Sequence, residues 1–201
     1  MVFSKKYDYI SFIFLSRTII NQLTAGMKHP LLLLAAIIVP FLASGQLRGS
    51  KDSLKYYDFC ALAQYDMIGD NAAAVYFLTK AIHIDPGDYG LFLRRADAKG
   101  LLCNWQGMED DLNMAIALDP GNMAAHILRA TAHEKLKKYR DAIKDYDYLI
   151  SVEPSYEGYY LGRGMNKIPL NDLEGACADF QHASKRGNYE AFKMYQEVCI
   201  K

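Results

Sequence analysis

The sequence has few of the features that identify an enzyme, a metal site or a nucleic-acid-binding surface. It holds 4 cysteines and 5 histidines, with no Cys-x-x-Cys pair and no Cys/His cluster at zinc-binding spacing. It has no phosphate-binding loop and no G-x-G-x-x-G or H-E-x-x-H motif. Lys+Arg 23 balances Asp+Glu 23, so the chain lacks the positive charge that attracts nucleic acid. We therefore expect a non-catalytic protein without a cofactor, a bound metal or a nucleic-acid partner.

Proline is also scarce, at 6 of 201 residues, and glycine, at 14, is not enriched. Hydrophobic residues make up 51% of the chain, including 15 Tyr and 9 Phe. This composition excludes a low-complexity or disordered chain, because such chains hold too few apolar residues to build a core. Length and composition together predict one packed domain, with an extra segment near the N-terminus.

That extra segment contains an uncharged apolar run at residues 31–42, shorter than the roughly 20 residues that an ordinary membrane-spanning helix needs. A short basic start precedes the run, and the small residues Ala-Ser-Gly at 43–45 follow it. This layout is typical of a secretory signal peptide at residues 27–45, cut before Gln46. It predicts export to the periplasm or cell surface of a bacterium, most simply a Gram-negative one. An uncleaved anchor or a buried helix is the alternative.

Residues 1–26 form a doubtful N-terminal extension, because Met27 already fits the start of the signal peptide. Two interpretations remain open: an upstream start that was assigned incorrectly, or a real extension with a second weak apolar segment. Residues 46–54 are interpreted as a linker between the cut and the folded domain.

A fixed period of 34 residues runs through the rest of the chain. Pro86, Pro120 and Pro154 are separated by 120 − 86 = 34 and 154 − 120 = 34 residues, and the next step reaches Asn188. Two columns of mostly small and of larger residues precede these turns with the same period: Ala74, Met108, Ala142 and Ala176, then Leu78, Leu112, Tyr146 and Phe180. Spacings of three and four residues place such columns on one face of a helix. The period therefore predicts stacked helical units.

Each period contains two helical stretches divided by a polar turn, and proline ends the second stretch because it has no N–H to donate. This pattern of period, columns and boundary prolines resembles tetratricopeptide repeats. The resemblance implies an all-α fold, a right-handed superhelical solenoid of helix–turn–helix repeats with a C-terminal capping helix. Four units are expected at residues 55–88, 89–122, 123–156 and 157–190, and the capping helix at residues 191–201.

Charged residues repeat with the same period. Arginines on the first helices are followed 16 residues later by aspartates on the second helices: Arg95 and Asp111, Arg129 and Asp145, Arg163 and Asp179. In the first unit both are missing together, since Ala61 and Phe77 stand in their places. Joint presence and joint absence predict structural ion pairs, because an unpaired buried charge is costly. A row of arginines that binds a ligand is the alternative.

The histidines of the repeat region show no catalytic arrangement. His83, His126, His133 and His182 occupy different repeat positions, and none has a matching Ser or Cys partner in a known motif. The column of His133 is otherwise filled by Tyr65, Lys99 and Lys167. Such a mixture favours a half-buried packing position for this histidine.

Two cysteines are expected to lie near each other. Cys177 is near the start of the last unit's second helix, and Cys199 lies on the capping helix that should pack beside it. Export would place both in an oxidising compartment, where a disulfide can form. Two buried free thiols are the alternative. Cys60 and Cys103 fit poorly as a pair, because they are offset by about 13 Å along the helix axis.

The resemblance also implies that the first helices line a concave surface, which in this family commonly takes an extended peptide or a partner's helix. By the family's pattern the inner positions are Tyr56, Phe59, Ala63, Met67, Leu93, Leu101, Ile127, Thr131, Leu161 and Met165. The row is largely apolar, and an exposed apolar groove indicates a partner or a self-contact. Family members that clamp a C-terminal carboxylate use Lys and Asn here, so Phe59 and Ala63 argue against that ligand. A groove filled by its own side chains is the alternative.

Two classes of function follow. The first is an exported, non-catalytic scaffold that binds a peptide or partner helix in the concave groove. The second is a membrane-anchored accessory subunit of an envelope assembly or secretion machine, which requires residues 31–44 to remain uncleaved. In both cases the expected partner is a protein or peptide, and the sequence does not name it.

Overall fold

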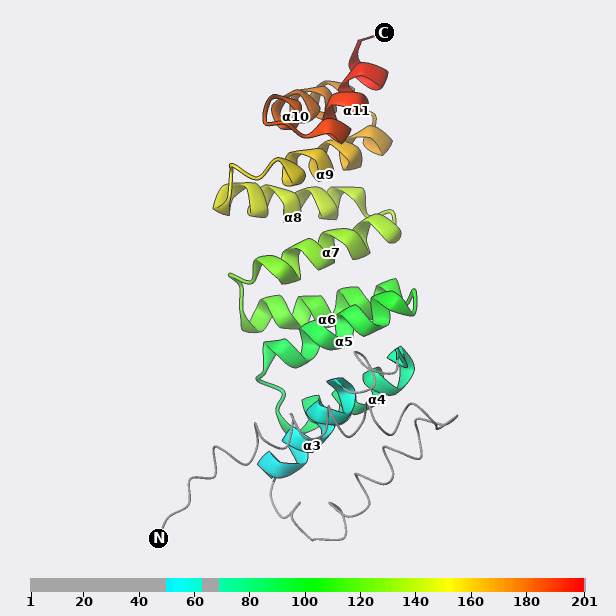
Figure 1. Ribbon diagram of the computed structural model, residues 1–201, viewed down its shortest axis with the longest axis vertical. Coiled ribbons are helices and arrows are strands. Elements are labelled where there is room, and N and C mark those ends of the chain that lie inside the picture. The colour runs from blue at the N-terminus through cyan, green and yellow to red at the C-terminus, as the bar shows by residue number, and fades with distance from the viewer. Residues whose placement is uncertain (1–49, 63–68, 201) are drawn as a thin grey trace, which may run out of the picture. The chain divides into compact units, whose positions relative to one another are not determined.

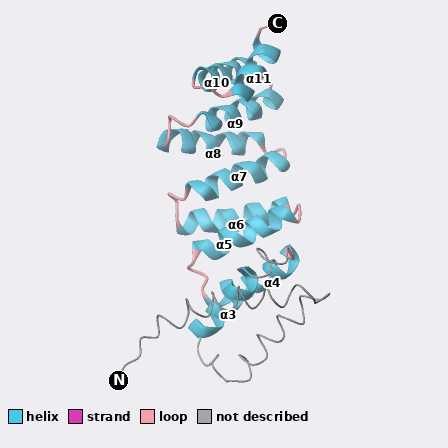
Figure 2. Cartoon of the chain, viewed as in Figure 1, coloured by secondary structure: helices cyan, strands magenta, loops and turns pink. Residues whose placement is uncertain are grey.

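A computed structural model describes residues 50–62 and 69–200 of the chain, apart from some side chains near the start of the first range. The expected extension (1–26) and the expected signal peptide (27–45) lie outside the described residues, as do Ala63 and Met67. Throughout the two described ranges the regular elements are α-helices and one short 3₁₀ helix, with no strand (Figure 2). This agrees with the expectation of an all-α fold.

From α5 onward the helices follow one another in antiparallel pairs joined by short turns. Their bounds are α3 (Ser50–Leu62), α4 (Asn71–Ile84), α5 (Tyr89–Leu101), α6 (Trp105–Leu118), α7 (Met123–Lys135), α8 (Tyr139–Val152), α9 (Glu157–Lys167), the 3₁₀ helix η2 (Ile168–Leu170), α10 (Leu173–Lys185) and α11 (Tyr189–Cys199). From α4 to α11 each helix packs on the next in chain order (Figure 1). The 34-residue period thus corresponds to one helix pair.

The ends of the pairs are set by the boundary prolines and by polar caps. Helices α4, α6 and α8 each end two residues before a proline. Two residues after Pro120, the side chain of Asn122 accepts the Ala125 N–H at 3.0 Å and begins α7. Stop and start signals are therefore separated by only a few residues, which turns the chain back on itself at each boundary.

Inside each pair the turn contains one residue in the left-handed backbone conformation. These residues are again 34 apart: Gly69 (φ 73°), Cys103 (φ 57°), Lys137 (φ 59°) and Asn171 (φ 60°). Only the first is a glycine, which adopts this conformation without steric cost. The turn geometry is thus common to the four pairs, although the residue that forms it differs.

Two helices begin earlier than expected from the sequence. Helix α3 starts at Ser50, inside the expected linker 46–54, and α11 starts at Tyr189 instead of residue 191. For α11 the cause is Asn188, whose side chain accepts the Ala191 N–H at 2.9 Å and so caps the helix. The turn residue that replaces the boundary proline is therefore also a helix start signal.

The repeating columns form the core between the helices. The second-helix column Ala74, Met108, Ala142 and Ala176 is buried, and so are Leu78, Leu112 and Phe180 of the larger column. Two such close approaches are at Gly162 and Gly164 on α9, where a Cβ atom would lie no more than 2.6 Å from the rings of Tyr146 and Phe180, respectively. Small residues on one helix and large ones on its neighbour therefore interlock to fill the interior.

Candidate functional site

The repeated arginines and aspartates meet within their own helix pairs. Each arginine lies on a first helix and donates two hydrogen bonds or more to a buried aspartate on the second helix, with the shortest N–O distance at 2.6 Å in every pair. The structure brings together the three expected pairs, Arg95 with Asp111, Arg129 with Asp145, and Arg163 with Asp179. The aspartates are at most 4% exposed, so these bonds neutralise charge in a nearly dry environment.

Each arginine also reaches back to the preceding helix pair. The Nη1 atom of Arg95 donates to Thr79 at 3.1 Å, that of Arg129 to Asn113 at 2.8 Å, and that of Arg163 to Asp147 at 2.6 Å. These acceptors also form a column of period 34, on the second helices. These acceptors were not identified from the sequence, because they are three different residue types that share only their 34-residue spacing. The guanidinium groups thus join one unit to the one before it.

A second cation approaches each buried aspartate from the position four residues after the arginine. Lys99 Nζ lies 2.8 Å from Asp111 Oδ2, and Lys167 Nζ lies 2.8 Å from Asp179 Oδ2. In the third unit this position holds His133, whose Nδ1 lies 3.2 Å from an oxygen of Asp145. The expectation of a half-buried packing position for His133 is wrong. The side chain is buried, at 6% exposure, because carboxylates on two neighbouring helices compensate its polarity.

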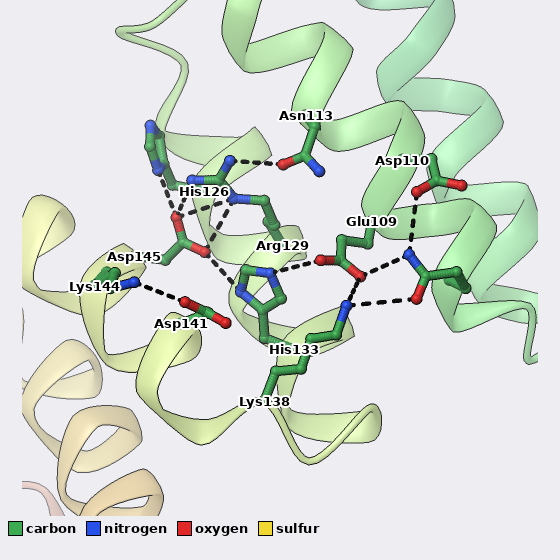
Figure 3. A network of polar contacts seen from close by, with 11 residues as sticks. Glu109, Asp110, Asn113, His126, Arg129, His133, Lys138, Asp141, Lys144 and Asp145 are labelled. Atoms are coloured by element: carbon green, nitrogen blue, oxygen red, sulfur yellow. Dashed lines mark hydrogen bonds and ion pairs between the residues drawn. The ribbon is translucent and has the colours of Figure 1, made fainter.

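The third unit therefore contains the densest polar cluster of the described residues (Figure 3). Asp145 on α8 also contacts His126 Nδ1 at 2.9 Å, while His133 Nε2 lies 3.3 Å from Glu109 on α6. Lys138, in the turn between α7 and α8, donates to the other oxygen of Glu109 at 2.6 Å. We call the set Glu109, His126, Arg129, His133, Lys138 and Asp145 the histidine seam. It joins α6 of the second unit to α7 and α8 of the third.

The electrostatics of the histidine seam favour ionised carboxylates. Burial by itself would raise the pKa of Asp145, but the contacts with His133, Arg129 and His126 outweigh burial and lower the pKa to about 2. Burial likewise opposes ionisation of Glu109, yet Lys138 and His133 lower its pKa below the ordinary value. Both groups therefore carry negative charge at neutral pH.

The expected cysteine pair lies at the C-terminal end of the stack. Cys177 on α10 and Cys199 on α11 form a disulfide, with their Cα atoms 5.8 Å apart. Cys60 is buried and Cys103 exposed, and neither forms a disulfide. The disulfide therefore ties the last helix to its neighbour.

The expected partner-binding positions share the first helices. Leu101, Ile127 and Met165 are exposed by 59%, 39% and 46%. Leu93, Thr131 and Leu161 are half-buried. We call these six described residues the first-helix row. Tyr56 and Phe59 lie on α3 with side chains that the structure does not describe, and Ala63 and Met67 lie outside the described residues.

Other kinds of site are not seen in the described part of the chain. Residues 50–62 and 69–200 hold no group of three or more His, Cys, Asp or Glu side chains arranged to bind a metal ion. Among the helices in these ranges, none is long and apolar enough to cross a membrane. The polar side chains of the histidine seam bond to one another, which makes that cluster an internal structural element and leaves the first-helix row as the candidate binding surface.

The comparisons with known proteins agree with this architecture. No protein-family model and no curated protein sequence matches the chain. Among solved structures, MamA from Desulfovibrio magneticus RS-1 is similar at a TM-score of 0.69 and 16% identity, over 74% of this chain and 85% of that one. The protein YrrB gives a TM-score of 0.62 and 15% identity, over 71% and 74%. The second tetratricopeptide repeat domain of human RPAP3 gives 0.54 and 23%, over 59% and 98%. The chain therefore has the tetratricopeptide repeat fold, as its resemblance to that family implied.

Proposed function

We propose that this protein is a non-catalytic scaffold that binds a peptide or a partner's helix along the first-helix row. The observation that carries the proposal is the exposure of Leu101, Ile127 and Met165 on three successive first helices, α5, α7 and α9. Exposed apolar side chains on neighbouring repeated elements offer contacts of the kind that bind a partner's apolar residues.

The similar structures support a peptide as the occupant. The RPAP3 domain was solved in complex with an HSP70 peptide, and YrrB is described as having an unusual peptide-binding site. In this chain the row offers Leu, Ile and Met instead of the Lys and Asn that clamp a C-terminal carboxylate. We therefore favour a partner segment that contributes apolar side chains over one held by its terminal charge.

The location of the scaffold is part of the proposal. The apolar run and small residues that precede Gln46 support export and cleavage at that residue. A second candidate, a membrane-anchored accessory subunit of an envelope assembly, rests on the same run remaining attached. Mass analysis of the protein isolated from its native cells separates the two. A chain that starts at Gln46 supports the exported scaffold and eliminates the anchor.

The binding surface is tested by introducing charge at exposed positions. The double variant Ile127→Glu, Met165→Glu changes two exposed side chains, so the fold is retained while their apolar contacts are removed. The matched control is Val152→Glu, because Val152 is equally exposed, at 50%, but lies at the end of the second helix α8. Proteins captured by the wild type and by the control should be lost from the double variant. Recovery of the same proteins with the double variant would eliminate the first-helix row as the binding surface.

A further inference from the structure

The third unit differs from its neighbours in the second cation that contacts the buried aspartate. In the second and fourth units this cation is a lysine, Lys99 or Lys167, a residue type whose ordinary pKa lies far above neutral pH. In the third unit the position holds His133, and histidine is the one residue type whose ordinary charge change falls between about pH 5 and 8. The same position in the fold therefore holds lysine in two units and histidine in the unit between them.

His133 is placed so that both of its ring nitrogens face carboxylates. Nε2 lies 3.3 Å from Glu109 Oε1 on α6. Nδ1 lies 3.2 Å from Asp145 Oδ2 on α8, an ion pair that is not well aligned for a hydrogen bond. A ring with two N–H groups attracts both carboxylates, whereas a neutral ring turns one lone pair toward a carboxylate oxygen. The contact between α6, α7 and α8 is therefore strongest when His133 carries both protons.

His126 has a comparable arrangement. Its Nδ1 lies 2.9 Å from Asp145 Oδ1, and its Nε2 lies 3.3 Å from the backbone carbonyl oxygen of Pro120. Both neighbours are acceptors, so this ring also satisfies both of them only with two N–H groups. The equivalent position of the fourth unit holds Tyr160, whose hydroxyl donates to the Pro154 carbonyl oxygen at 3.1 Å. A tyrosine thus makes the same backbone contact without an imidazole.

We propose that the histidine seam is a pH-sensitive joint, in which protonated His133 and His126 hold the second and third units together and loss of their protons loosens the contact. The groups facing the two rings come from each neighbouring element: Glu109 from α6, Asp141, Asp145 and the stacked ring of Tyr148 from α8, Lys138 from the turn, and Arg129 from α7 itself. The carboxylates remain ionised as pH rises from 5.5 to 8, since the pKa of Asp145 is about 2 and that of Glu109 is lowered. Histidine is therefore the residue type of the seam whose ordinary charge change falls in that range.

The joint has a consequence for the rest of the stack. Helix α7 carries His126 and His133 on its buried side, and it also carries Ile127 and Thr131 of the first-helix row. Loosening the contacts of α7 with α6 and α8 changes how this helix is held between its neighbours. The effect on the first-helix row rests on the proposed function, whereas the pH sensitivity of the histidine seam can be tested without any partner.

The experiment compares the protein with a variant in which the third unit receives the residues of the fourth. The variant His126→Tyr, His133→Lys replaces both imidazoles by the side chains found at Tyr160 and Lys167. The control is His83→Asn, because His83 is exposed on α4 and outside the seam. The thermal unfolding midpoint is measured between pH 5.5 and 8, together with amide hydrogen exchange in α7 and α8 corrected for its chemical rate.

For the wild type and for His83→Asn, the midpoint should fall by about 3 °C as pH rises through this range. The corrected exchange of α7 and α8 should rise by about tenfold. The double variant should show neither change. A pH-independent wild type, or a double variant that retains the full pH dependence, overturns the proposal. If the double variant does not fold, the corrected amide exchange of the wild type decides alone. Exchange that accelerates with rising pH only in α6, α7 and α8 supports the joint. Exchange that accelerates uniformly along the chain, or not at all, overturns it.

Discussion

The first helix pair and the three pairs that follow fill the same positions in different ways. In the first pair Ala61 and Phe77 stand where the others have arginine and aspartate, and Ala61 packs in an apolar cluster with Leu78 and Leu91. In the later pairs the arginine bonds both to its own aspartate and to a polar residue of the preceding pair. The backbone fold therefore does not depend on the ion pair.

The difference indicates what the arginine adds. Within the described residues no helix pair precedes α3, so a side chain at position 61 would have no earlier second helix to reach. Among the described residues, the arginine and aspartate are present where a described helix pair precedes them. This pattern supports coupling between neighbouring units as the physical role of the arginine column, with the aspartate neutralising its charge in the interior.

The largest effect is expected from removing the most heavily bonded aspartate. Asp145→Ala leaves Arg129, His126 and His133 without their common partner in a site that is 1% exposed. We expect the free energy of unfolding to fall by about 3–5 kcal/mol, because the Arg129 guanidinium and the ring nitrogens of the two histidines lose their buried acceptor. Urea denaturation followed by circular dichroism measures the loss.

The matched control places the residues of the first unit at the equivalent positions of the second unit. Asp111 contacts both Arg95 and Lys99, so the variant Arg95→Ala, Lys99→Tyr, Asp111→Phe places the residues found at positions 61, 65 and 77 in the second unit and removes all three charges together. Replacing a whole buried charged group by residues that carry no charge is often close to neutral, so this variant should lose no more than about 1–2 kcal/mol. A triple variant as unstable as Asp145→Ala would mean that the charged and uncharged arrangements are not interchangeable.

Much of this difference between the helix pairs could be predicted from the sequence, and what could not be predicted has a physical reason. The period gave the helix pairs, and the joint absence at positions 61 and 77 predicted the ion pairs. The backward contacts to Thr79, Asn113 and Asp147 were missed, because a side chain's reach to another unit depends on how the units stack. The role of His133 was misjudged for the same reason: Glu109, on the neighbouring unit, helps to make its burial favourable.

The second largest effect concerns the opposite end of the stack. The Cys177–Cys199 disulfide closes a segment of 22 residues and holds α11 against α10. Cys177→Ser should lower stability by about 3 kcal/mol, because it restores freedom to the unfolded chain. Amide exchange should accelerate mainly in α11, while α4 and α5 at the first end remain unchanged. An unaltered melting temperature and unaltered exchange would indicate that packing alone holds the last helix.

A smaller effect is expected from Arg129→Ala, which removes the coupling to Asn113 but leaves Asp145 with His126 and His133. Stability should fall by about 2 kcal/mol, less than for Asp145→Ala, because the guanidinium is partly exposed and the carboxylate keeps two partners. Binding of a partner by the folded variant should be intact. Lost binding at an unchanged melting temperature would instead favour the alternative in which the arginine row contacts a ligand.

The smallest predicted effect tests the turn that the four pairs share. Gly69 occupies the left-handed position in the first pair, whereas Lys137 occupies it in the third at φ 59°. Lysine is strained there and glycine is not, so Lys137→Gly should raise the free energy of unfolding by about 0.5–1 kcal/mol. The side chain of Lys137 is exposed, and the backbone N–H that bonds to the Glu134 carbonyl oxygen is retained in the variant. Gly69→Lys should lower stability by a similar amount. If Lys137→Gly raises the free energy of unfolding but Gly69→Lys does not lower it, the unfolded state of the first pair, and not strain in its turn, would determine the effect of the substitution there.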